Sequence, residues 1–142
     1  MTHTIKANDS VSSIISAVNN ELPKACSDSD RVYDCYTIID EFHANMREHV
    51  APKDPDFQWW LTVSFHQPTI RLRFEYGGPC FDPTQVPRVE QQAIEFRPIG
   101  GLGLTLITQL SDKIDYTYQS GLNTLTVEVN IIENSKEEDT CL

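Results

Sequence analysis

The sequence lacks a long hydrophobic run, a paired cysteine motif and a secretory leader. No segment approaches the ~20 consecutive apolar residues that a membrane-spanning helix needs, so we expect no membrane partner. Residues 1–8 contain no apolar core of the kind that secretory signals carry. The four cysteines form no CxxC pair, which argues against a disulfide framework: Cys26, Cys35, Cys80 and Cys141. Together these absences predict a cytoplasmic protein with free thiols.

Basic side chains are also few. The chain has 11 Lys and Arg against 21 Asp and Glu, which gives a formal net charge of −10. Such a surface repels phosphodiester backbones at long range, so we expect no nucleic-acid partner. A small anion such as a nucleotide is not excluded, because a helix N-terminus and a metal ion can hold it locally.

What the sequence does contain is a series of amphipathic segments that fits one domain of 142 residues. Apolar residues recur at helical spacing over residues 11–22 and 32–46. Runs typical of strands cover residues 2–7, 57–65, 69–76, 114–118 and 122–132. This order predicts an α+β two-layer sandwich, with helices on one face of a mixed, mostly antiparallel sheet. We place that single domain at residues 1–132 and an acidic flexible tail at residues 133–142.

A carboxylate and an amide lie four residues apart in the second predicted helix. Glu41 and Asn45 therefore project from nearly the same face, about 6 Å apart along the helix axis. This pair suits a general base and a magnesium ligand, because Mg²⁺ prefers hard oxygen donors. The same spacing is also common on a plain solvated helix face, and the pair alone does not decide between these interpretations.

A glycine cluster, Gly100-Gly101-Leu102-Gly103, opens a third predicted helix. Glycines allow a ligand close to the backbone, and a helix start offers unpaired N–H groups to a phosphate. No Lys-Ser/Thr follows, so this is not a Walker loop. An ordinary turn is the alternative interpretation.

These segments, taken in order, resemble the small ATP-binding proteins of the anti-sigma-factor serine kinase type. Those proteins belong to the GHKL superfamily of gyrase, Hsp90, histidine-kinase and MutL ATPases. Residues 40–45, DEFHAN, resemble the family's DELLTN N-box, and residues 78–83, GPCFDP, resemble its GPPFDP segment. Residues 98–104, PIGGLGL, match its PIGGLGI segment closely. The likeness covers roughly residues 8–130, and the glycine segment is its most specific part.

The resemblance implies a Bergerat ATP-binding fold with ATP and Mg²⁺ as ligands. Asn45 matches the asparagine that holds Mg²⁺, and Glu41 matches the base that activates water or a partner's serine hydroxyl. A lid over the phosphates corresponds to residues 84–99. The remaining nucleotide contacts implied by the resemblance are Gly78, Gly100, Gly101, Gly103, Leu104 and Thr126, with Thr124 as an alternative to Thr126.

The sequence departs from the family at one position. Family members carry an aspartate, in a DxG motif, that accepts a hydrogen bond from the adenine amino group. Aligned without a gap, that aspartate falls on Tyr76; with one inserted residue it falls on Glu75. Glu75 would keep an acceptor, one methylene further out, whereas Tyr76 has no carboxylate. Losing one buried polar contact costs about 1–3 kcal/mol.

Two functions remain open at this stage. In the first, the chain is an anti-sigma regulatory factor with Mg²⁺-dependent serine/threonine kinase activity toward an anti-anti-sigma (STAS) protein. In the second, it binds nucleotide weakly or not at all and regulates a sigma factor or another signalling partner by docking alone. Relatives often dimerise, so a homodimer is an alternative to a monomer.

Overall fold

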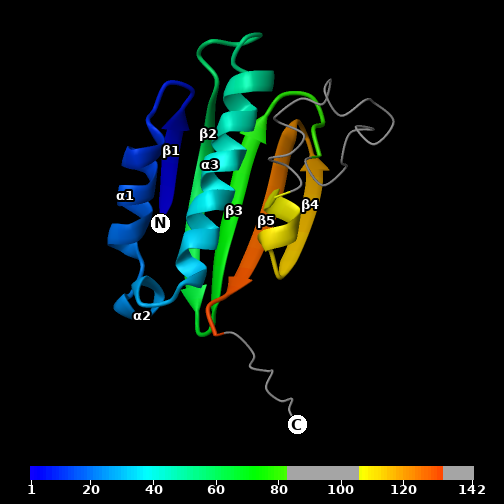
Figure 1. The fold of residues 1–142 in the computed structure, drawn as a ribbon. Coiled ribbons are helices and arrows are strands. Elements are labelled where there is room, and N and C mark those ends of the chain that lie inside the picture. Colours follow the sequence, from blue (N-terminus) through cyan, green and yellow to red (C-terminus); the bar gives the residue numbers. More distant parts are fainter. Residues whose placement is uncertain (83–105, 133–142) are drawn as a thin grey trace, which may run out of the picture.

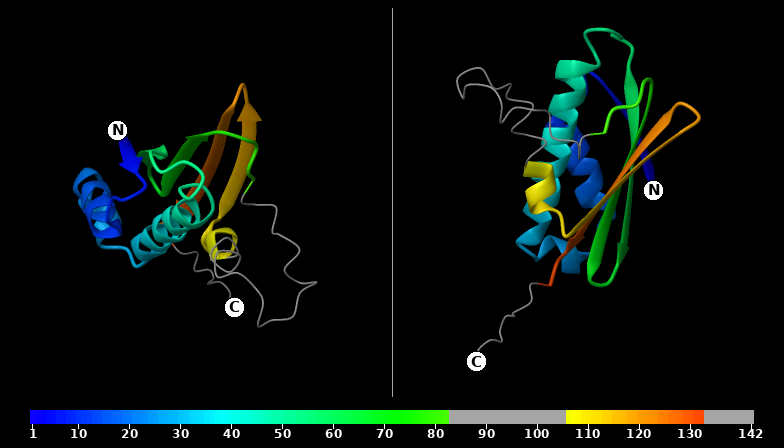
Figure 2. Two further views of the ribbon diagram at one scale, coloured as in Figure 1. Left: turned by 90° about the horizontal axis from the view of Figure 1, so that it is seen from above. Right: turned by 90° about the vertical axis from the view of Figure 1, so that its right-hand side faces the viewer.

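The computed structural model describes residues 1–82 and 106–132. Their helices lie on one face of a five-stranded sheet with the strand order β1-β2-β3-β5-β4 (Figures 1 and 2). Every paired neighbour runs antiparallel. The elements are β1 (Thr2–Lys6), α1 (Val11–Glu21), α2 (Lys24–Ser27), α3 (Arg31–His49), β2 (Gln58–His66), β3 (Thr69–Gly77), β4 (Lys113–Gln119) and β5 (Leu122–Asn130), with residues 106–110 also helical. The predicted α+β two-layer architecture is confirmed.

Local signals in the sequence explain where α1 begins and ends. The hydroxyl of Ser10 accepts a hydrogen bond from the backbone N–H of Ser13 at 3.2 Å, which caps the helix start. Ile14 and Val18 face the core. The helix ends at Glu21 because Pro23 cannot continue it.

The strands β3 and β5 alternate strictly between a buried face and an open face. Along β3 every second side chain is buried against the helices, and the residues between them are exposed or half-buried. The same alternation runs along β5. The largest fully buried side chains come from α3, the sheet and residues 106–110: Ile38, Ile39, Phe42, Met46, Trp59, Leu61, Ile70, Leu72, Phe74, Tyr76, Ile107 and Leu125.

α3 is the central helix, with α1 on one side and the end of the 106–110 helix on the other (Figure 1). On the α1 side, Nε2 of the His43 ring donates to the backbone carbonyl of Asp9 at 2.9 Å, because its Nδ1 accepts the indole N–H of Trp59. On the opposite side, Arg31 pairs with Asp112 at 2.7 Å. The two contacts fix which face of α3 is turned toward α1 and which is turned away from it.

Some expectations need correction or lie outside the described residues. No helix was expected between residues 22 and 32, yet α2 forms there just before α3, and Cys26 is fully buried. The cysteines of the described part are free thiols. Of the helix expected from Gly100 onward, residues 106–110 are described. The predicted lid at 84–99 and the tail at 133–142 are not among the described residues.

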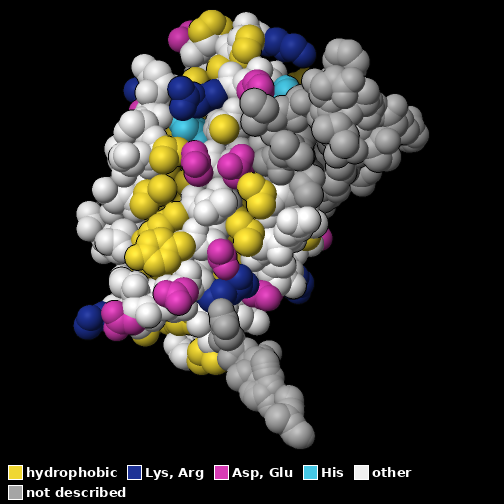
Figure 3. Space-filling model, viewed as in Figure 1, with side chains coloured by type: hydrophobic (Ala, Val, Ile, Leu, Met, Phe, Trp, Pro, Cys, Tyr) yellow, Lys and Arg dark blue, Asp and Glu magenta, His cyan; other side chains and the backbone are white. Residues whose placement is uncertain are grey.

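The surface over the helices carries acidic side chains spread across it rather than gathered in one patch (Figure 3). In the part of the chain that is described, no helix is long and apolar enough to cross a membrane.

Candidate functional site

Asn45 is the most unusual polar residue of α3. Its side chain is 1% exposed, and its Nδ2 donates to the backbone carbonyl of Glu41 at 2.8 Å. Its Oδ1 is buried and has no hydrogen-bond partner within residues 1–82 and 106–132. Leaving a buried acceptor unpaired costs about 1–3 kcal/mol. This oxygen is therefore available to bind a cation or to accept a hydrogen bond from a ligand.

Glu41 lies one turn before Asn45 and is half-buried. Burial raises the pKa of its carboxyl group above the usual 4.5, and the negative charge of Asp40 raises it further. A carboxylate with a raised pKa accepts a proton more readily near neutral pH. Glu41 therefore has the electrostatics of a base, although nothing in the described residues shows what it would deprotonate.

Both side chains lie on the side of α3 that faces away from α1. Asn45 comes 14 residues after Arg31, close to four full turns at ~3.6 residues per turn, so the two point in similar directions. Arg31 contacts Asp112 and the backbone carbonyl of Leu110, at the end of the 106–110 helix. Asn45 and Glu41 are thus turned toward the side of the fold where that helix lies.

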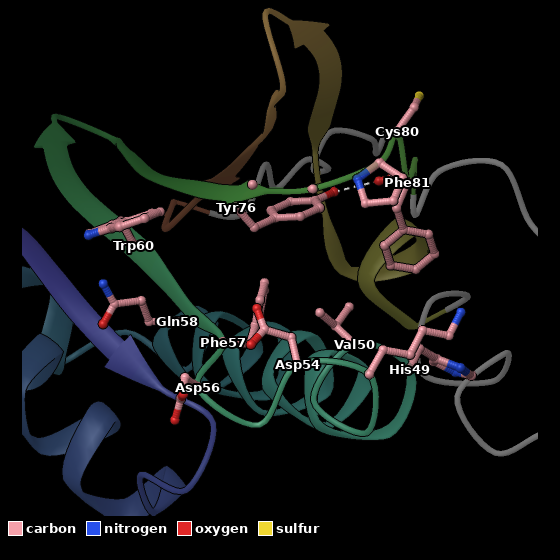
Figure 4. A pocket seen from close by; sticks show the side chains of 14 residues that line it. His49, Val50, Asp54, Asp56, Phe57, Gln58, Trp60, Tyr76, Cys80 and Phe81 are labelled. Carbon is pink, nitrogen blue, oxygen red and sulfur yellow. Dashed lines mark hydrogen bonds between the residues drawn. The ribbon is translucent and has the colours of Figure 1, made fainter.

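A cavity of about 920 Å³ begins one turn beyond Asn45, where α3 ends (Figure 4). Neither Glu41 nor Asn45 lines it, but His49, four residues after Asn45, does. The walls come from the end of α3, the α3–β2 connection, the start of β2 and the end of β3 with the segment after it. The lining residues are His49, Val50, Lys53, Asp54, Asp56, Phe57, Gln58, Trp60, Tyr76, Gly77, Gly78, Pro79, Cys80 and Phe81.

The wall after β3 is fixed by hydrogen bonds. The hydroxyl of Tyr76, whose ring is buried, donates to the backbone carbonyl of Phe81 at 2.6 Å (Figure 4). The hydroxyl of Tyr118 donates to the carbonyl of Gly78 at 3.1 Å. Gly78 has a φ of +99°, a conformation that side-chain-bearing residues rarely adopt, so glycine suits this turn.

Residues 6–129 match the family model of the histidine kinase-like ATPase domain. The chain belongs to this family. The match confirms the superfamily that the sequence motifs resembled, and the observed architecture agrees with it. No curated protein matches the sequence.

Histidine kinase-like ATPase domains bind ATP, usually with Mg²⁺. The donor set of this chain fits that ion, because the buried amide oxygen of Asn45, which has no partner among the described residues, is a hard ligand. Among the described residues no group of three or more His, Cys, Asp or Glu side chains could hold a metal. A magnesium ion at Asn45 would therefore rely on phosphate oxygens and water for its other ligands.

Asn123 is a site residue that the sequence analysis missed. It is fully buried, and its Nδ2 donates to the carbonyls of Tyr76 and Pro79 at 3.1 and 3.2 Å. Its Oδ1 accepts from the backbone N–H of Phe81 at 2.9 Å and from the hydroxyl of Tyr116. It thereby fixes the cavity wall of this ATPase domain. The sequence did carry a signal for it. Side chains of a strand alternate between its two faces, and residue 123 falls on the same face as the buried residues of β5.

Two of the predicted nucleotide contacts lie on the other face of the sheet. Glu75 follows the outward parity of β3, and its carboxylate lies 3.6 Å from Arg73. Thr126 follows the outward parity of β5 and pairs with Arg73 and Asp115 of the neighbouring strands. The structure does not bring either residue to the helix-facing side, where the Asn45 side chain and the ring of Tyr76 lie.

The other predicted contacts divide into two groups. Gly78 lines the cavity, and its contact with nucleotide stays a prediction. Gly100, Gly101, Gly103 and Leu104 lie outside the described residues. Their assignment to the phosphates stays a prediction of the motif resemblance.

Proposed function

We propose that the chain binds ATP with Mg²⁺ and acts in the cytoplasm as an anti-sigma regulatory factor, phosphorylating an anti-anti-sigma (STAS) partner on serine or threonine. The single observation that carries the nucleotide part is the buried, unpaired Oδ1 of Asn45. Membership of the histidine kinase-like ATPase family supports ATP as the ligand. The kinase activity and the partner are supported by the motif resemblance of residues 40–45 and 98–104.

Each residue has a defined role in this proposal. Asn45 supplies an oxygen ligand for Mg²⁺, which when bound neutralises charge on the phosphates. Glu41 accepts the proton of the partner's hydroxyl as that oxygen forms a bond to the γ-phosphorus. The bond between the γ-phosphorus and the bridging oxygen breaks, and ADP leaves. The raised pKa of Glu41 favours its part in this step.

A second candidate function is a docking module that regulates a sigma factor or another partner without using nucleotide. The observation that favours it is the position aligned with the family's adenine-binding aspartate. Tyr76 stands there with its hydroxyl engaged by Phe81, and the carboxylate of Glu75 is on the far face of the sheet. The cavity thus lacks the acceptor that the family uses for adenine.

Transfer of phosphate from labelled ATP to purified STAS proteins tests the kinase proposal. We expect Glu41→Gln to lower the transfer rate by about 10²–10⁴-fold while ATP still binds, because the variant lacks the base. Glu48→Gln is the matched control, since Glu48 is an exposed carboxylate of the same helix. ATP binding without transfer to any STAS protein would contradict the kinase activity and favour the docking module.

A further inference from the structure

The cavity at the end of α3 combines flat apolar walls with two carboxylates. Phe57, Tyr76 and Phe81 give it aromatic sides, and Asp54 and Asp56 are the acidic residues that line it. Aromatic walls suit a planar heterocycle, because stacked rings gain contact area over their whole faces. A carboxylate in such a cavity is an acceptor for N–H groups at the edge of that heterocycle.

The backbone of Asp54 is held in place by the turn that follows α3. Its backbone N–H donates to the carbonyls of Val50 and Ala51 at 3.1 and 3.2 Å, and its own carbonyl accepts the N–H of Phe57 at 2.9 Å. The side chain itself makes no hydrogen bond or ion pair within the described residues. The turn is therefore held by its backbone alone, and the carboxylate of Asp54 remains available to accept a hydrogen bond from a ligand.

The two acids of the connection point in different directions. Figure 4 shows the carboxylate of Asp54 directed into the space beneath Tyr76, whereas the carboxylate of Asp56 is directed away from it. The hydroxyl of Tyr76 is already committed to the carbonyl of Phe81. Glu75 is on the opposite face of the sheet. Of these polar groups, Asp54 is the one that is directed into the cavity and has no partner among the described residues.

We propose that Asp54, from the α3–β2 connection, is the specificity residue of this cavity and accepts a hydrogen bond from the exocyclic amino group of a purine base. This inference rests on the proposed nucleotide binding and names how the base is recognised. The aminopurine lies between the aromatic walls, and its amino edge faces the α3–β2 connection rather than β3.

The chemistry makes a clear distinction between two nucleotides. Adenine carries an exocyclic amino group, which donates to a carboxylate. Hypoxanthine, the base of ITP, carries a carbonyl at the same position. That carbonyl and the carboxylate of Asp54 are both acceptors, so no hydrogen bond forms between them. A site whose acceptor pairs with that amino group therefore binds the analogue less tightly, because the analogue has no donor at this position.

Calorimetric binding of ATP and ITP with Mg²⁺, to wild type and two variants, tests the proposal. We expect wild type to bind ATP at least about tenfold more tightly than ITP, which is the loss of one hydrogen bond to a charged group. Asp54→Ala should bring the ATP-to-ITP ratio close to one. Asp56→Ala, the matched control in the same connection, should leave the ratio at its wild-type value.

The ratio is the decisive quantity, because removing a negative charge can change the affinity for both triphosphates together. An unchanged ratio in Asp54→Ala, or equal binding of ATP and ITP by wild type, overturns the role of Asp54 while the proposed ATP binding stands. No binding of either nucleotide by wild type overturns both proposals. Because the Asp54 side chain has no partner in the described fold, we expect the variant to fold normally.

Discussion

The side-chain oxygen of Asn123 on β5 accepts the backbone N–H of Phe81 at 2.9 Å, although the two residues are 42 positions apart in the chain. The same amide group also donates to the carbonyls of Tyr76 and Pro79. One buried side chain thus holds the segment that forms a wall of the cavity. The shape of the cavity depends on a strand that does not itself line it.

Replacing Asn123 should therefore affect both stability and ligand binding. Asn123→Ala leaves the N–H of Phe81 and the carbonyls of Tyr76 and Pro79 without their partner. We expect the free energy of unfolding to fall by about 2–4 kcal/mol in urea titrations, because several buried groups lose a hydrogen bond. Asn20→Ala, an exposed asparagine of α1, is the control and should change it by less than about 0.5 kcal/mol. Equal effects of the two variants would contradict the role assigned to Asn123.

The ring of His43 links α3 to the sheet and predicts a pH dependence of stability. Its Nδ1 accepts the indole N–H of Trp59 at 3.2 Å, which requires an unprotonated nitrogen. Burial lowers the pKa of His43 below the usual 6.5. The unfolded chain therefore binds the proton more tightly than the folded chain, and the free energy of unfolding decreases as the pH falls below about 6.5.

Urea unfolding at a series of pH values between 7.5 and about 5 measures this effect. The comparison variant is His43→Gln, which lacks the titrating ring. We expect its free energy of unfolding to fall less steeply with decreasing pH than that of wild type. Parallel curves for the two proteins would show that the His43 ring does not carry the pH dependence.

Arg31 joins three parts of the fold and should be a sensitive position. Its guanidinium pairs with Asp34 on its own helix and with Asp112 before β4. It also donates to the carbonyls of Leu110 and Asn130, at 3.4 and 3.2 Å. Burial acts to lower the pKa of Arg31, but the hydrogen bonds and charges of Asp112 and Asp34 outweigh it and raise that pKa, so the guanidinium stays charged.

We expect Arg31→Ala to lower the free energy of unfolding by about 1–3 kcal/mol, because the hydrogen bonds are charge-assisted and partly shielded from water. Arg73→Ala is the control, since Arg73 is 45% exposed and lies 3.6 Å from Glu75. Exposed pairs of this kind contribute less than about 1 kcal/mol. A double-mutant cycle of Arg31 with Asp112 separates their pairwise energy, and a coupling near zero would contradict this account.

Much of the fold could be predicted because the local signals agree with the tertiary structure. Ser10 caps α1 and Pro23 ends its segment, and both are visible in the sequence. The alternation along residues 69–76 predicts both a strand and its buried face. α2 was missed because four residues are too few to show a helical period, and because the burial of Cys26 depends on how α2 packs.

The candidate site was less accessible to sequence reasoning. Asn45 was identified from its spacing to Glu41 and from the motif resemblance, but its unpaired oxygen is a property of the packed helix. Asn123 was not identified because a polar residue in a strand is usually assigned to the solvent-exposed face of the sheet. The alternation of β3 also indicates where Glu75 points. Because Phe74 and Tyr76 on either side of it face the helices, Glu75 must face the opposite side of the sheet.

The binding of ATP by wild type and Asn45→Ala, with and without Mg²⁺, tests the central claim most directly. We expect micromolar binding by wild type that requires Mg²⁺, and loss of that binding in the variant, because the hard oxygen ligand is gone. Asn45→Asp keeps an oxygen at the same place and should retain Mg²⁺-dependent binding, with circular dichroism showing that both variants are folded. Equal Mg²⁺-dependent binding by wild type and Asn45→Ala, or no binding by wild type at millimolar ATP, would contradict the account.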